Sequence, residues 1–66
     1  MNKGVEMLIS LRKSKNLTQD ELADKIEVKR STIACIEAGI NTPSVATAKR
    51  LGNELGFDWT LFYEEE

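Results

Sequence analysis

The sequence predicts a small all-α fold of five short helices, and three observations support this prediction. Apolar side chains recur at intervals of three and four residues along the 66-residue chain, and no segment shows the alternation of a strand. Helix-interrupting residues such as Gly39, Pro43 and Gly56 stand between these periodic segments. The composition, 41% hydrophobic and 30% charged, suits one compact domain over residues 1–66, since so short a chain buries only about 60% of its unfolded surface.

Local side-chain patterns place the first two helices. The first is predicted over residues 3–14, whose apolar side chains fall on one stripe. The second begins at a capping box, in which the side chains of Thr18 and Glu21 each satisfy a free backbone donor of the other residue. Leu17 before this cap and Leu22 after it are placed for a hydrophobic staple, so the second helix starts directly after Thr18.

The spacing of the next segment predicts a helix-turn-helix. Ala23 is the small residue that two helices need where they cross at a steep angle over a short turn. Val28 can close the turn onto the core, and Ile33 with Ile36 can anchor the third helix. Gly39 stands where a left-handed helix end belongs. The opposite face of the third helix is then free to enter the major groove of DNA.

The last two helices are also marked by their ends. The fourth is predicted from Ser44, and it is ended by Gly56. Asp58 is placed to cap a last short helix over the sequence WTLFY. Phe57, just before that cap, can pack on Phe62 as a staple.

The charges are unevenly distributed along the chain. Residues 1–53 hold nine cations and six anions, a net charge of +3, whereas residues 54–66 hold five anions and no cation, a net charge of -5. The overall charge of -2 therefore does not argue against nucleic acid, because the field of the contacting face decides. The acidic tail at residues 64–66 either interacts only with solvent or has an electrostatic role.

Several classes of function are disfavoured. The chain has no histidine and one cysteine, which excludes a disulfide framework, a Cys/His zinc site and imidazole chemistry. No glycine-rich loop or carboxylate pair marks an enzyme, so we expect neither catalysis nor a cofactor. No long apolar run and no signal-peptide core occur, so we expect a cytoplasmic protein without a membrane partner. No second domain is evident for binding a small-molecule ligand.

The run LRKSKNLTQDELADKIEVKRSTIACIEAGINTPSVATAKRL resembles the Cro/C1-type family, also called lambda-repressor-like or XRE, of helix-turn-helix regulators. The resemblance covers about residues 5–63 and rests on LTQ-x-ELA, STI-xx-IE-x-G and the PS that opens the fourth helix. The ending GFDWTLFY is similar to that of small phage-borne regulators of this family. The resemblance implies a five-helix domain that binds a palindromic double-stranded DNA operator as a homodimer and controls transcription, most often as a repressor.

The resemblance also implies roles for single residues. Thr18 and Gln19 match residues that hold the DNA backbone, and Arg30 matches a base-facing position at the start of the recognition helix, near residues 29–37. A structural ion pair is implied between Arg12 and Glu37. The full set of implied DNA contacts is Thr18, Gln19, Lys29, Arg30, Ser31, Thr32, Cys35, Asn41 and Thr42. The expected dimer seam follows Gly56 and comprises Phe57, Thr60, Leu61 and Tyr63.

The chain departs from the family pattern at two places. Glu27 stands where the turn usually has a glycine with positive φ, which leaves room for a slightly different turn. The outward face of the third helix, at 100° per residue, carries only small side chains: Ser31, Ala34, Cys35 and Ala38. We therefore expect binding to rest largely on phosphates and DNA shape, and we interpret Cys35 as an inert small residue rather than a redox sensor.

A second hypothesis is a helical protein-interaction module that keeps this fold without DNA binding. The small side chains of the outward face and the acidic tail favour it. Salt dependence separates the two hypotheses, because the neutralisation of phosphates makes DNA affinity fall steeply with salt.

Overall fold

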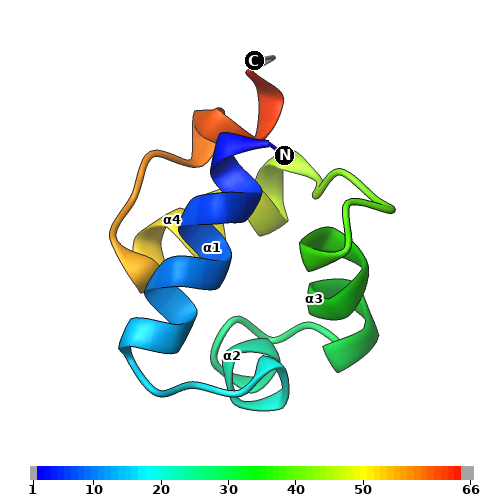
Figure 1. Ribbon diagram of the computed structural model, residues 1–66. Coiled ribbons are helices and arrows are strands. Elements are labelled where there is room, and N and C mark those ends of the chain that lie inside the picture. The colour runs from blue at the N-terminus through cyan, green and yellow to red at the C-terminus, as the bar shows by residue number, and fades with distance from the viewer. Residues whose placement is uncertain (1, 65–66) are drawn as a thin grey trace.

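The structure of the protein is a computed structural model, which describes residues 2–64 (Figure 1). Its elements are α1 (Lys3–Ser14), α2 (Gln19–Lys25), α3 (Arg30–Glu37), α4 (Val45–Leu55) and the short helix η1 (Trp59–Tyr63). The described residues form no strand, so the all-α prediction is confirmed. Glu65 and Glu66, which belong to the predicted acidic tail, lie outside the described residues.

The fifth predicted helix is a 3₁₀ helix rather than an α-helix. Its backbone bonds span three residues, from Leu61 N–H to the carbonyl of Asp58 (3.2 Å) and from Glu64 N–H to that of Leu61 (3.4 Å). The Asp58 side chain caps it as predicted, accepting a bond from the backbone of Thr60 at 3.0 Å. A segment of five residues is too short for a well-formed α-helix, and the tighter winding is common in such pieces.

The helix ends agree with the sequence predictions. Both bonds of the capping box are present: Glu21 N–H donates to the Thr18 hydroxyl (3.0 Å), and Thr18 N–H donates to the Glu21 carboxylate (2.9 Å). Ser44 caps α4 by accepting from Thr47 N–H. Gly39 and Gly56 have φ angles of 77° and 80°, the left-handed conformation expected where α3 and α4 end.

The core lies between α1, α2, α3 and α4, and η1 packs on α1 and α4 at one end (Figure 1). Ala23 is buried at the steep crossing of α2 and α3, as its small size predicts. The predicted anchors of α3 are buried as well. The largest fully buried side chains come from all four α-helices: Leu8, Leu22, Ile33, Ile36 and Leu51. Packing from every α-helix therefore fixes which face of α3 is left outward.

The last segment packs tightly against two helices. The rings of Phe57 and Phe62 meet edge to face, with 5.6 Å between their centroids, as the staple predicts. A Cβ on Gly4 of α1 would lie 2.6 Å from the backbone nitrogen of Phe62, and one on Gly52 of α4 would lie 2.7 Å from the carbonyl oxygen of Phe57. These two glycines let the backbone of the ending lie directly on α1 and α4.

Candidate nucleic-acid interface

The recognition helix α3 presents one face to the core and one outward. Ile33 and Ile36 are buried, whereas Ser31 and Ala38 are exposed. The other two residues predicted to face outward, Ala34 and Cys35, are only half-buried rather than fully exposed. The accessible part of this face is therefore concentrated at the two ends of α3.

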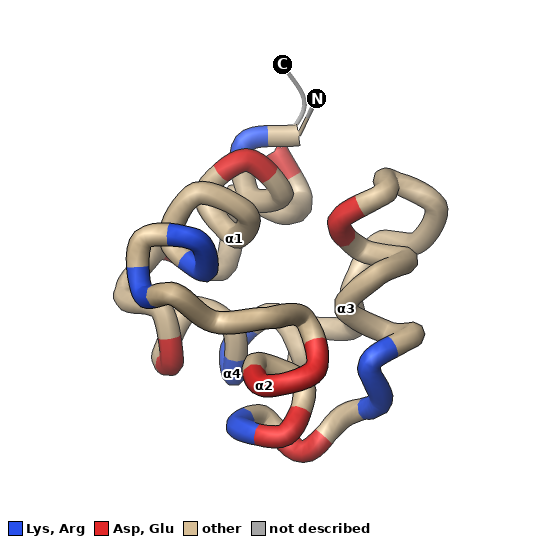
Figure 2. Tube along the Cα trace, turned by 60° about the horizontal axis from the view of Figure 1, so that its bottom comes forward, with Lys and Arg blue, Asp and Glu red and all other residues tan. Residues whose placement is uncertain are grey.

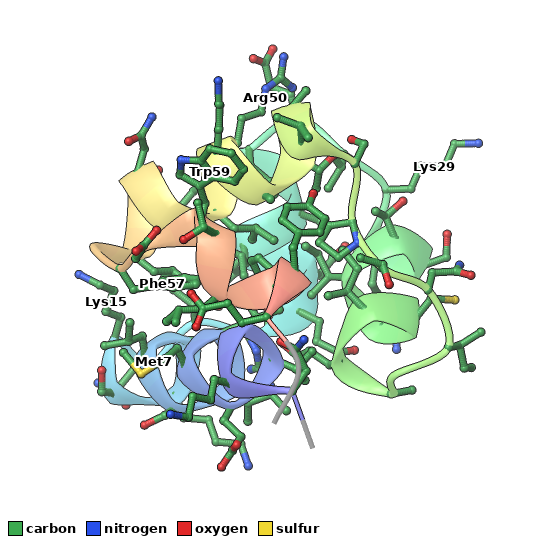
Figure 3. The ribbon with its side chains drawn as sticks, turned by 90° about the horizontal axis from the view of Figure 1, so that it is seen from above. Met7, Lys15, Lys29, Arg50, Phe57 and Trp59 are labelled. Carbon is green, nitrogen blue, oxygen red and sulfur yellow. The ribbon has the colours of Figure 1, made fainter. Side chains whose placement is uncertain are left out.

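Two cations lie at the start of α3. Lys29 is the N-cap residue and Arg30 the first helical residue, and both are exposed. Figure 2 shows them as one blue stretch directly ahead of α3, and in Figure 3 the side chain of Lys29 extends away from the protein. The Lys29 side chain makes no capping bond. The free amides and positive dipole end of α3 thus combine with two exposed cations, an arrangement that suits phosphate.

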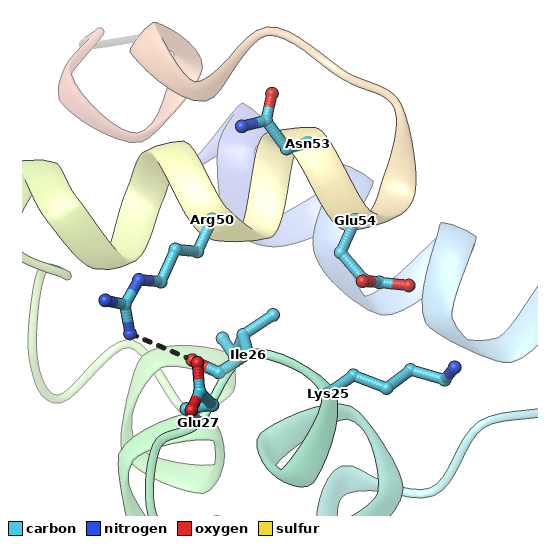
Figure 4. Close-up of a pocket in the computed structure, with 6 residues that line it drawn as sticks. All are labelled: Lys25, Ile26, Glu27, Arg50, Asn53 and Glu54. Atoms are coloured by element: carbon cyan, nitrogen blue, oxygen red, sulfur yellow. Dashed lines mark hydrogen bonds between the residues drawn. The ribbon is translucent and has the colours of Figure 1, made fainter.

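The turn before α3 keeps a left-handed residue although it lacks glycine. Glu27 has a φ of 60°, so the departure from the family pattern does not change the turn at this position. Val28 N–H donates to the Ala23 carbonyl at 3.0 Å and closes the turn onto α2. From α4, Arg50 donates to the carbonyl of Ile26 at 3.1 Å, and these residues line a shallow polar pocket behind the turn (Figure 4).

Arg12 and Glu37 form a bidentate ion pair across α1 and α3, as the resemblance implies. Arg12 Nε lies 2.7 Å from Glu37 Oε2, and its Nη2 donates to Oε1 at 3.0 Å. A third donor, Nη1, binds the carbonyl oxygen of Leu17 at 2.7 Å. The side chains are 12% and 8% exposed, so the pair is largely withdrawn from water.

Gln19 makes a contact that sequence reasoning missed. Its Nε2 donates to Glu37 Oε1 at 3.1 Å, which joins the start of α2 to the ion pair. No spacing rule brings residues 19 and 37 together, and only the implied Arg12–Glu37 pair hinted at this neighbourhood. The second N–H and the carbonyl oxygen of the Gln19 side-chain amide make no hydrogen bond within the described residues. The second N–H can therefore donate to a phosphate.

The structure places the remaining predicted contact residues around α3. Thr18, Asn41 and Thr42 are exposed, the first at the cap of α2 and the others in the loop after α3. Thr32 is half-buried in the first turn of α3. The Thr18 hydroxyl accepts its capping bond, which leaves its proton free to donate. No helix within residues 2–64 is long and apolar enough to cross a membrane.

Comparisons with known proteins agree with this geometry. A family model described as "Helix-turn-helix" matches residues 8–62. A Bacillus subtilis protein named "Uncharacterized HTH-type transcriptional regulator YqaF" is 43% identical over 54 residues, which cover 82% of this chain and 71% of that protein. A Methanothermobacter thermautotrophicus protein, also named an uncharacterized HTH-type transcriptional regulator, is 44% identical over 45 residues, 68% of this chain and 65% of its own. No solved structure matches significantly.

The steep α2–α3 crossing, the left-handed turn and the exposed cations at the start of α3 define a DNA-binding protein of the helix-turn-helix class. The chain belongs to the Cro/C1-type helix-turn-helix family of transcriptional regulators.

Proposed function

We propose that this protein binds a palindromic DNA operator as a homodimer and represses transcription from the promoter that contains it. The observation that carries the proposal is the position of Lys29 and Arg30. Both are exposed at the start of a helix whose opposite face is anchored by the buried Ile33 and Ile36. A short helix held in this way can enter a major groove with its charged end first.

The DNA contacts divide by chemistry. Arg30 is the only long side chain with several donors on α3, so we assign to it the readout of a base edge, at guanine. Thr18, Gln19, Lys29 and the loop residues Asn41 and Thr42 are assigned to phosphates. Ser31, Thr32 and Cys35 are small enough for α3 to lie close to the groove floor. Phosphate contacts then supply most of the affinity.

The dimer seam is assigned to the last segment. Tyr63 is 42% exposed, while Thr60 and Leu61 are half-buried. The Tyr63 hydroxyl donates to the Pro43 carbonyl at 2.7 Å, which holds its ring in place for a partner subunit. Phe57 is packed on Phe62 and contributes mainly by shaping this surface. Two copies related by a two-fold axis would present their α3 helices to half-sites roughly 34 Å apart.

Repression is the regulatory outcome that needs least from the protein. A dimer bound across a promoter excludes polymerase by occupancy alone, whereas activation requires a further contact with the transcription machinery. The exposed cations at the start of α3 would hold the protein on the DNA. Binding at that site is sufficient for repression.

The proposal is tested by selecting bound sequences from a random duplex pool and measuring the stoichiometry by analytical ultracentrifugation. We expect a palindrome with half-sites about one helical turn apart, bound by two subunits. A single asymmetric half-site bound by one subunit would contradict the homodimer. In a promoter fusion, the selected operator should lower expression when the protein is present.

A second candidate is the protein-interaction module, favoured by the small side chains on the outward face of α3. For DNA binding, the logarithm of affinity should fall linearly with the logarithm of salt concentration, with a slope of about -0.9 per phosphate neutralised. Failure to bind any duplex at low salt would favour the interaction module instead.

A further inference from the structure

The loop between α3 and α4, residues 38–44, carries two of the residues assigned to phosphate contacts, Asn41 and Thr42, and both are exposed. Few backbone bonds hold this loop. Asn41 N–H reaches a carbonyl of α3 only at 3.4 Å, and within the described residues neither Thr42 nor Ser44 donates a bond to another backbone group. Pro43, which lies between them, has no N–H to donate. The positions of Asn41 and Thr42 therefore depend on other contacts of the loop.

Pro43 is the point at which the loop is fixed to the rest of the protein. It is the one buried residue among residues 38–46. Its carbonyl oxygen accepts a hydrogen bond from the Tyr63 hydroxyl at 2.7 Å, and no backbone N–H of the described residues donates to it. Pro43 also lines a small groove together with Val5 of α1 and Phe62 of η1. The hydroxyl of Tyr63 therefore holds the loop directly beside its two exposed polar residues.

The Tyr63 side chain is itself held firmly. The residue before it, Phe62, is 3% exposed, and its carbonyl accepts a bond from the Asn2 side chain at 2.8 Å. The Tyr63 ring meets that of Trp59 edge to face, with 6.0 Å between the centroids. Figure 1 shows η1 and the loop at the same end of the molecule. The hydroxyl is thus a fixed donor, and one short hydrogen bond joins it to a loop that has few bonds of its own.

We propose that Tyr63 is a positioning residue for DNA binding: through the Pro43 carbonyl, its hydroxyl holds Asn41 and Thr42 where they meet phosphates. The inference rests on the proposed operator binding. In this role the Tyr63 side chain acts on the loop and does not touch the DNA. A loop that is ordered before binding loses little conformational freedom when DNA arrives, whereas the ordering of a loose loop reduces affinity.

The experiment removes the hydroxyl and keeps the ring. In Tyr63→Phe, the affinity for the duplex selected by the parent protein, measured by fluorescence anisotropy, should fall about two- to tenfold for each half-site, the factor that one net hydrogen bond supplies. The factor should be the same for a scrambled duplex, because phosphate contacts carry no sequence information. A bond that only stabilised the fold would lower the melting temperature and leave the affinity of the folded protein unchanged. Binding is therefore measured well below the melting temperatures of both proteins.

The salt dependence separates Tyr63 from the charged residues. Asn41 and Thr42 are uncharged, so weakening their phosphate contacts leaves the number of released counterions unchanged. Tyr63→Phe should therefore keep the slope of the logarithm of affinity against the logarithm of salt concentration. Lys29→Ala, in contrast, should make this slope less steep by about one unit per subunit.

A double-mutant cycle tests whether Tyr63 acts through the loop. Asn41→Ala combined with Thr42→Ala removes the side chains that the loop is expected to present to DNA. In that background Tyr63→Phe should cause no further loss of affinity, because the effects of residues that act through one contact do not add. Ser14→Ala is the matched control, since it deletes a hydroxyl that donates to the Leu11 carbonyl at 2.9 Å, at the end of α1. It should leave the affinity unchanged.

Four results would overturn the inference. If Tyr63→Phe binds the operator as tightly as the parent protein, or if its loss persists in full without the Asn41 and Thr42 side chains, Tyr63 does not position the loop, although the selected operator would still support the proposed function. Since Tyr63 also belongs to the proposed dimer seam, the sedimentation of the free variant is compared with that of the parent protein. Weaker dimerisation would make the hydroxyl a subunit contact instead. If the parent protein selects no duplex at all, the proposed function and this inference fail together.

Discussion

The guanidinium of Arg12 joins three parts of the chain that are distant in sequence. It binds Glu37 of α3 through two nitrogens and the carbonyl of Leu17, just before α2, through the third. Glu37 in turn accepts from Gln19. Since both charged side chains are largely buried, neither can be rehydrated easily when its partner is removed.

Arg12→Ala should therefore lower the free energy of unfolding by about 3–5 kcal/mol, because it strands the buried carboxylate of Glu37. Lys13→Ala is the matched control: it removes an exposed cation from the adjacent position of α1 and should cost little. Urea denaturation of both variants measures the difference. Equal midpoints would show that the pair is hydrated in solution.

Arg30→Ala should weaken operator binding by about 1–3 kcal/mol and relax the preference at one base position per half-site. If Arg30 met only phosphate, affinity would fall evenly across sequences and the salt slope would shrink by about one unit. Cys35→Ser is a nearly isosteric control on α3. Affinities for the selected operator and for a scrambled duplex, each as a function of salt, distinguish the outcomes. Unchanged binding of Arg30→Ala to both duplexes would favour the protein-interaction module.

Glu27→Gly should stabilise the protein by about 1 kcal/mol. The φ of 60° at this residue is unfavourable for a side chain with a Cβ, and glycine relieves that strain, although it also gives the unfolded chain more freedom. Asp24→Gly, in the helical part of α2, should have the opposite sign, at about 1 kcal/mol of destabilisation. Chemical denaturation measures the stability of both variants. If both are less stable than the parent protein, the φ of Glu27 is not a source of strain.

The starts of α2 and η1 are stabilised by capping side chains from nearby residues. The pKa of the Glu21 carboxyl is lowered from its ordinary value of 4.5, chiefly because it accepts the backbone N–H of Thr18. The pKa of Asp58 is lowered from 3.8, chiefly by the hydroxyl of Thr60 and then by its backbone N–H. Both caps need the ionised carboxylate. Their contribution to stability is fully present above the ordinary pKa and is lost as the pH falls through the lower pKa of the folded state.

Glu21→Gln should therefore reduce the loss of thermal stability that the parent protein shows on acidification below pH 4.5, the ordinary value for this carboxyl. Asp58→Asn should act in the same way at lower pH, below 3.8. The two effects should add, since the caps belong to different elements. Melting temperatures between pH 7 and pH 2 measure them. An identical pH profile for Glu21→Gln and the parent protein would mean that the capping box does not persist in solution.

The extent to which each element could be predicted follows from the range of its interactions. The start of α2 and the ends of α3 and α4 were predicted correctly, because each is set by residues within a few positions, such as Thr18 with Glu21. The 3₁₀ winding of η1 depends on its short length and its packing on α1 and α4, which local pattern does not encode. The Gln19–Glu37 bond and the partial burial of Cys35 depend on how α2 and α3 cross, so the sequence alone missed both.

For the molecule as a whole, the last segment closes one end of the helix assembly. The Asn2 side chain accepts from Val5 N–H at the start of α1 and donates to the carbonyl of Phe62 at 2.8 Å. Beside this bond, Gly4 permits direct contact between the backbones of α1 and η1. The surface proposed for the dimer seam is thus held on the same core that positions α3.

Gly4→Ala should destabilise the protein by about 1–3 kcal/mol, because the added methyl group would overlap backbone atoms that cannot yield easily. Ser10→Ala, at an exposed position of α1, is the control and should be neutral or slightly stabilising. If the last segment also forms the seam, Gly4→Ala should weaken dimerisation, which sedimentation at several concentrations measures. A variant as stable as the parent protein would show that η1 is not packed on α1 in solution.

Trp59 gives this ending an intrinsic optical signal. Trp59 is the only tryptophan of the chain, and Tyr63 is the only tyrosine. The centroids of their rings lie 6.0 Å apart. The ammonium of Lys49 lies 5.2 Å from the centroid of the Trp59 ring. At such a separation, excitation energy absorbed by the tyrosine passes to the indole, so the folded protein should emit almost entirely as tryptophan. Trp59 belongs to η1 and lies over α4, whereas Lys29 stands at the start of α3 (Figure 3). If the last segment forms the proposed dimer seam, this emission should report subunit assembly separately from DNA binding, without an attached dye.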